Sequence, residues 1–103
     1  MTAQAFDAAL AALPPSAAPI EVVGDGALAR ALREHLGTRA AGERPAAIIE
    51  TTGDPDAIRA ALARVVDLGT VVLAGPEPQA EVALDLYADL HVRGLTLAGT
   101  AGR

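Results

Sequence analysis

The sequence predicts an α/β domain: a small parallel sheet of about four to five strands with flanking helices. Short aliphatic runs alternate with stretches of helical periodicity along the chain, which is typical of parallel sheets. The core must consist mainly of Ala, Val, Leu and Ile, because Phe6 and Tyr87 are the only aromatic residues. Aliphatic strands of this kind suit a sheet that helices cover, and we expect right-handed crossovers between its strands.

The length of 103 residues predicts a single domain, since domains usually contain about 100–150 residues. We assign residues 1–15 to a helix and linker and residues 19–100 to the core. No apolar run approaches the roughly 18–20 residues of a membrane span, and the first residues lack the basic segment of a signal peptide. The expectation is a soluble, cytoplasmic protein without a membrane partner.

The charge pattern and the missing cysteines exclude several kinds of site. The net charge of −5 argues against a nucleic-acid partner. The absence of Cys excludes disulfides, thiolate chemistry and zinc sites built on Cys. His35 and His91 lie on predicted helices and are expected at the surface, so no metal site is predicted.

The first half of the chain contains two predicted helices around one strand. Apolar residues at helical spacing predict a helix over Thr2–Leu13, which two prolines end. The β-branched run Ile20–Val23 predicts a strand that enters a glycine turn. A helix over Ala27–Leu36 follows and ends at a glycine. The polar segment after it is weakly patterned, although Thr38–Ala41 could pair briefly at a sheet edge.

The second half repeats the alternation of strand and helix. We predict strands over Ala46–Thr52, Thr70–Ala74 and Leu95–Gly99. Asp54 is expected to cap a helix that begins at Pro55 and reaches Val66. A short, irregular helix is expected over Val82–Val92, with Tyr87 in a packing role.

The glycine turn is the first candidate binding motif. Residues 24–29, GDGALA, fit the pattern G-x-G-x-x-G/A between a strand and a helix, the context that a dinucleotide fingerprint requires. Gly24 would permit the tight turn, Gly26 would let the backbone approach a pyrophosphate, and the small Ala29 would let helix and strand pack closely. Backbone amides at the start of the helix would face the anion. The alternative is that the two glycines serve only to turn the chain.

Three ordered stretches support a family resemblance: VVGDGALARALREHLG, AAIIETTGDPDAIRAALARVVDLGTVVLAGP and LDLYADLHVRGLTLAG. They resemble the C-terminal Rossmann cofactor domain of the medium-chain dehydrogenase/reductase superfamily, which includes alcohol dehydrogenases. The resemblance implies NAD or NADP as cofactor, with the pyrophosphate at the glycine turn, the ribose at the second strand's end and the nicotinamide at the third. The implied cofactor-binding residues are Gly24, Asp25, Gly26, Ala27, Thr51, Thr52, Gly53, Ala74 and Gly75.

The departures from this family bear on catalysis. The chain is expected to be a truncated form without the family's catalytic domain. It also lacks most of the second strand, its helix and the third strand between Leu36 and Ala46. The leading hypothesis is therefore an NAD(P)-binding module that needs a separate catalytic partner chain. A catalytically silent dimerisation or scaffold protein is the alternative, and a stand-alone oxidoreductase using Glu50 or His91 comes third.

Other side chains allow two interpretations each. Glu50, on a buried strand, is either an acid/base group or a strand-end carboxylate bonded to backbone or Arg. Arg30 and Arg33 either approach a phosphate or belong to an exposed helix face. The single serine, Ser16, lies in the Pro-rich linker, so no nucleophilic triad is predicted and the catalytic residues stay unknown.

The last strand predicts the assembly. Leu95–Gly99 contains no charge and no Pro, and uncovered apolar edges of this kind tend to pair with another chain. In the family that the chain resembles, the corresponding strands pair across a two-fold axis. We expect a homodimer joined through this strand.

Overall fold

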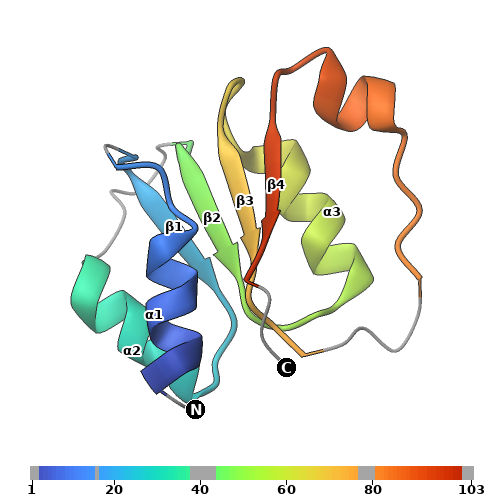
Figure 1. Ribbon diagram of the computed structural model, residues 1–103. Helices are drawn as coiled ribbons and strands as arrows, with labels where there is room; N and C mark the ends of the chain where they lie inside the picture. The colour runs from blue at the N-terminus through green and yellow to red at the C-terminus, as the bar shows by residue number, and fades with distance from the viewer. Residues whose placement is uncertain (1–2, 16, 38–43, 77–80, 101–103) are drawn as a thin grey trace.

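The computed structural model describes residues 3–15, 17–37, 44–76 and 81–100. Within these ranges the chain forms a four-stranded, all-parallel sheet with helices on both faces (Figure 1). The predicted α/β fold class is thereby confirmed. No helix in the described ranges is long and apolar enough to span a membrane.

The strands lie across the sheet in the order of the sequence. They are β1 (Ile20–Val23), β2 (Ala47–Glu50), β3 (Thr70–Leu73) and β4 (Thr96–Gly99), paired as β1-β2-β3-β4. Each begins within one residue of its predicted start. The edge strand considered for Thr38–Ala41 lies outside the described residues.

Two hydrophobic clusters cover the two faces of the sheet. Paired residues Val22, Ile49 and Val72 belong to the first cluster, and their neighbours Ile48 and Val71 belong to the second. This division follows from the alternation of side chains along a strand. Both faces of β2 and β3 are covered, which explains why these strands are almost continuously aliphatic.

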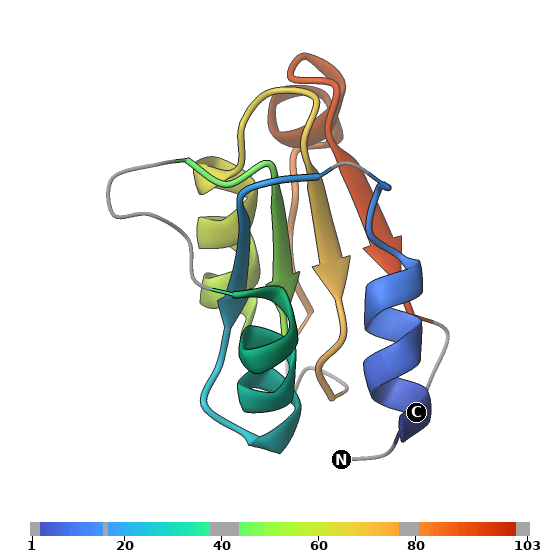
Figure 2. The ribbon, with the colours of Figure 1, turned by 90° about the vertical axis from the view of Figure 1, so that its left-hand side faces the viewer.

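Two helices cover each face. α1 (Ala3–Ala11) and α2 (Ala27–Leu36) lie on the first, while α3 (Pro55–Arg64) and the π-helix η1 (Leu86–His91) lie on the second (Figure 2). α2 has its predicted bounds. α3 ends two residues before the predicted Val66, because its C-cap residue already has extended backbone angles.

The last predicted helix is shorter than expected. Instead of Val82–Val92, one π turn forms, in which the amide of Val92 donates to the carbonyl of Tyr87 at 2.9 Å. Tyr87 is 68% exposed, so its predicted packing role is wrong. Leu84 and Leu90 contact the second cluster instead, and Tyr87 stacks on exposed His91 with ring centroids 5.4 Å apart.

The crossovers do not all have the same hand. Each step from β1 to β4 moves the same way across the sheet, yet α2 lies on one face and α3 on the other. In Figure 1 the strands run downward and the steps go to the right, with α1 and α2 toward the viewer and α3 behind the sheet. The β2-α3-β3 crossover is therefore right-handed and β1-α2-β2 is left-handed. The expectation of uniformly right-handed crossovers is wrong at this step.

The unusual hand has a simple topological explanation. A doubly wound Rossmann sheet has the strand order 3-2-1-4-5-6, and the helices on either side of strand 1 lie on opposite faces. Strands 1, 4, 5 and 6 of that order become neighbours when strands 2 and 3 are absent. The helix after strand 1 then keeps its face, and its connection becomes left-handed. The order and faces of β1-β2-β3-β4 match this arrangement.

Candidate functional site

The three predicted loops meet at the carboxyl ends of β1, β2 and β3. The hydroxyl of Thr51 donates to the carbonyl of Val23 at 2.6 Å, and a Cβ on Gly24 would collide with that hydroxyl. A Cβ on Gly75 would lie 2.7 Å from the amide nitrogen of Gly53. The loops therefore pack directly against one another, and glycine makes this close approach possible.

The two glycines of the glycine turn, Gly24 and Gly26, have different roles. Gly24 has φ +126°, a backbone conformation that favours glycine, and it also provides the room for Thr51. Gly26 has φ −75° and ψ −178°, which any residue can adopt, and nothing lies within 4 Å of a Cβ placed there. Ala29 is fully buried in the first cluster, as close packing of helix and strand requires.

The amino end of α2 has no side-chain cap. Its N-cap is Gly26, with no side-chain hydrogen bond to the first turn, and the intrahelical ladder begins where the amide of Arg30 donates to the Gly26 carbonyl at 3.1 Å. The preceding amides have no carbonyl partner in the helix. Ala27 and Asp25 are exposed beside them. The first turn of α2 thus has backbone donors without a side-chain acceptor, of which those of Gly26 and Ala27 belong to exposed residues, with one carboxylate nearby.

The Glu50 side chain is hydrogen-bonded to the loop that follows β2. Its carboxylate is buried, with 1% of the residue exposed, and accepts hydrogen bonds from the amides of Thr52 at 2.7 Å and Gly53 at 3.0 Å. The Thr52 hydroxyl also donates to it. These contacts favour the structural interpretation of Glu50 over acid/base chemistry, because the carboxylate is occupied by backbone donors.

The hydroxyl groups of the second loop are already engaged. Thr51 donates to Val23 and Thr52 donates to Glu50, so neither hydroxyl proton is free for a ribose. Ala74 is bound through its amide, which donates to the Glu50 carbonyl at 2.9 Å, and Gly75 is exposed. Contacts to a ligand from this loop would come from hydroxyl lone pairs and from exposed backbone.

Arg33 lies beside the glycine turn that follows β1. Its guanidinium donates to the carbonyl of Val22 at 2.9 Å and to that of Gly24 at 2.5 Å. The sequence pattern left open whether this side chain approaches a phosphate or belongs to an exposed helix face. It is exposed and also bonded to β1, a contact that helical periodicity alone could not have revealed.

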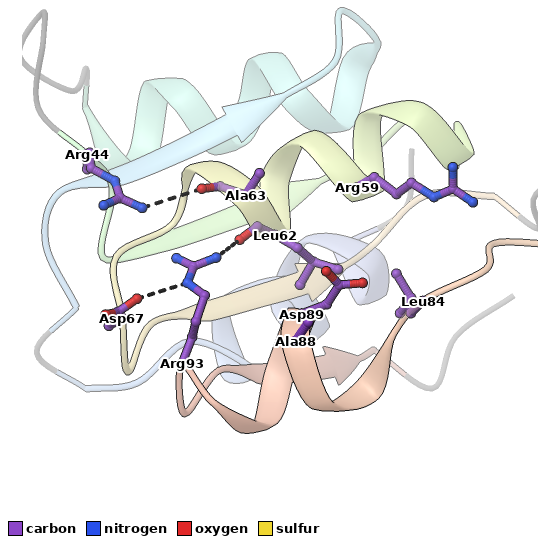
Figure 3. A pocket seen from close by; sticks show the side chains of 9 residues that line it. All are labelled: Arg44, Arg59, Leu62, Ala63, Asp67, Leu84, Ala88, Asp89 and Arg93. Carbon is purple, nitrogen blue, oxygen red and sulfur yellow. Dashed lines mark hydrogen bonds and ion pairs between the residues drawn. The ribbon is translucent and has the colours of Figure 1, made fainter.

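A hollow of about 440 Å³ lies between α3 and η1, away from the three loops (Figure 3). None of the predicted site residues lines it. Arg44 donates to the carbonyls of Arg64 at 3.1 Å and Val65 at 3.0 Å, and Arg93 donates to those of Leu62 and Val65. These two arginines satisfy the last carbonyls of α3, and neither role is predicted by the sequence pattern.

The arginines that line the hollow do not form an anion-binding site. Figure 3 shows Arg44 and Arg59 at opposite ends of the hollow, with the Arg44 guanidinium directed at α3 carbonyls and the Arg59 guanidinium pointing away from the hollow. Arg93 is paired with Asp67 at 2.9 Å. The guanidinium groups do not converge on one point, and those of Arg44 and Arg93 are bound to carbonyls at the end of α3. We therefore place the candidate site at the loops that follow β1, β2 and β3.

The histidines do not form a metal site in the described part of the chain. Both are exposed, as predicted. The ring of His35 makes an edge-to-face contact with that of Phe6, with the ring centroids 5.5 Å apart. No group of three or more potential metal ligands occurs among residues 3–15, 17–37, 44–76 and 81–100.

Comparison with known proteins adds no relative to these observations. The chain matches no protein-family model and no curated protein sequence.

Proposed function

We propose that this protein binds a nucleotide at the carboxyl ends of β1 and β2, with its phosphate groups over the start of α2. The observation that carries the proposal is the reversal between α2 and α3, which leave neighbouring strands toward opposite faces. In open α/β sheets, ligands bind in the crevice outside the strands at such a switch point. The uncapped amides of α2 lie at this switch point and would bind an anion.

A dinucleotide of the NAD(P) type fits the order of the loops. The pyrophosphate would lie at Gly24–Gly26, the ribose next to it near Thr51–Gly53, and the nicotinamide end near Ala74 and Gly75. The direct packing of these loops supports the proposal. The resemblance to the medium-chain dehydrogenase/reductase cofactor domain supports the same ligand class. Hydride-transfer chemistry would then depend on a separate catalytic chain.

Titration calorimetry with NAD(H), NADP(H) and 5′-AMP tests this function. We expect heat of binding from the unchanged protein, and a loss of affinity in Gly26→Val, whose side chain would stand between the ligand and the α2 amides. The fold should persist, since a side chain at this position meets open space. Ala60→Val, on the exposed surface of α3, is the control and should bind normally. Absence of heat at millimolar ligand would reject nucleotide binding.

The second candidate function is a dimerisation scaffold, which one observation favours. Within the described residues, no strand pairs with the outer edge of β4. The amide of Thr96 donates to Gly69 in the direction of β3, so the amide of Leu97 points outward. A second copy could add its own β4 antiparallel to this edge.

Leu97→Pro tests the scaffold directly. It removes the outward amide and should convert a dimer to a 10.4 kDa monomer in sedimentation equilibrium. Leu97→Ala is the matched control, because it loses the same half-buried side chain but keeps the amide. A monomeric unchanged protein at micromolar concentration would reject the dimer.

A further inference from the structure

The most informative side chain beside the proposed site is Arg33. It belongs to the second turn of α2, yet its guanidinium reaches back to the carbonyls of Val22 and Gly24. Both bonds use the same terminal nitrogen, Nη2. They fix the guanidinium beside the glycine turn.

The side of β1 on which Arg33 lies follows from the pairing. The amide of Thr51 donates to the carbonyl of Val23 at 3.0 Å, so the Val23 carbonyl faces β2. Carbonyls alternate along a strand, and the Val22 carbonyl therefore faces away from β2. Arg33 thus lies on the outer side of β1, the side on which a complete doubly wound sheet continues with its second strand.

Arg33 also retains donors and charge. No carboxylate pairs with it in the described part of the chain, where the ion pairs join Arg64 to Glu21 and Arg93 to Asp67. Its Nε and Nη1 groups make no hydrogen bond to another described residue. The guanidinium can therefore bind an oxyanion while Nη2 stays on the backbone.

In doubly wound sheets, the side chain beside the adenosine ribose determines which ribose is accepted. An acidic side chain there accepts a hydrogen bond from the ribose 2′-hydroxyl, whereas an arginine accommodates a 2′-phosphate. We propose that Arg33 makes this site selective for nucleotides with a phosphate monoester on the adenosine ribose, of which NADP is one. This inference rests on the proposed nucleotide-binding function.

The experiment compares two ligand pairs by titration calorimetry: NADP with NAD, and adenosine 2′,5′-bisphosphate with 5′-AMP. We expect the ligand with the extra phosphate to bind about tenfold more tightly in each pair. Arg33→Gln keeps a donor for the β1 carbonyls but removes the charge, and should reduce the preference to about twofold or less. Arg30→Gln, one turn away on the same exposed face, is the control and should keep the preference.

The outcomes separate the inference from the proposed function. Equal affinity within both pairs would overturn the role of Arg33 and leave nucleotide binding in place. A full preference in folded Arg33→Gln would also overturn it. No binding of any of the four ligands would overturn both. If Arg33→Gln does not fold, as circular dichroism would show, the comparison of ligands on the unchanged protein still decides the selectivity.

Discussion

Helices α2 and α3 both have ten residues and both begin where a strand of the sheet ends, but their amino ends differ. The Asp54 side chain caps α3 and accepts from the Ala57 amide at 3.2 Å. Glu50 binds the loop just before it. α2 begins at Gly26 without any side-chain cap. The difference shows that side chains satisfy the first backbone donors of α3 and leave those of α2 without a side-chain acceptor.

The carboxyl ends of the two helices differ as well. α2 ends at Gly37, whose amide donates to the Arg33 carbonyl at 2.9 Å, so a glycine cap suffices. α3 ends in extended backbone at Val65, and its carbonyls are bound by Arg44 and Arg93. α3 is therefore held by side chains at both ends.

The largest loss of stability should follow from changing Glu50, whose carboxylate accepts hydrogen bonds from the loop after β2. Glu50→Gln replaces one carboxylate oxygen with an NH2 group, so the amide of either Thr52 or Gly53 faces a donor, and the free energy of unfolding should fall by about 3 kcal/mol. Urea denaturation measures this loss. Thr52→Ala keeps the carboxylate and its two backbone donors but removes the hydroxyl that donates to Glu50 and accepts from the Asp54 amide, and should lose about 1 kcal/mol. Equal losses in the two variants would contradict a central role for the carboxylate.

A smaller loss is expected at the other end of α3. Arg93→Met keeps the aliphatic stem but removes the donors to Leu62 and Val65, and should lower the free energy of unfolding by about 2 kcal/mol. Asp67→Asn removes only the charge of an exposed partner and should change it by less than about 0.5 kcal/mol. If both variants lose the same amount, the ion pair rather than the carbonyl contacts stabilises this end.

The smallest change in stability, and the sharpest change in binding, should come from giving α2 a cap. In Gly26→Ser the hydroxyl would accept from the first-turn amides, with a gain of only a few tenths of a kcal/mol. It would compete with a phosphate and lower nucleotide affinity by about fivefold. Gly26→Ala adds a Cβ without an acceptor and is the control. Unchanged affinity in the serine variant would locate the ligand away from α2.

The sequence by itself determined the elements and their local chemistry. Aliphatic runs and helical spacing predicted all four strands and the bounds of α2, because period and turn residues act over a few neighbours. The Asp54 cap before Pro55 was predicted for the same reason, since a capping bond spans only three residues. The glycine turn was also recognisable from six consecutive residues.

Only the tertiary structure decided how these elements combine. The left-handed crossover of β1-α2-β2 depends on which faces α2 and α3 cover, which no local pattern specifies. Arg93 binds carbonyls 28 and 31 positions away, and Arg33 binds one 11 positions away. A long guanidinium side chain can satisfy any carbonyl that folding brings within reach. Its partner therefore follows from the packing of the whole chain.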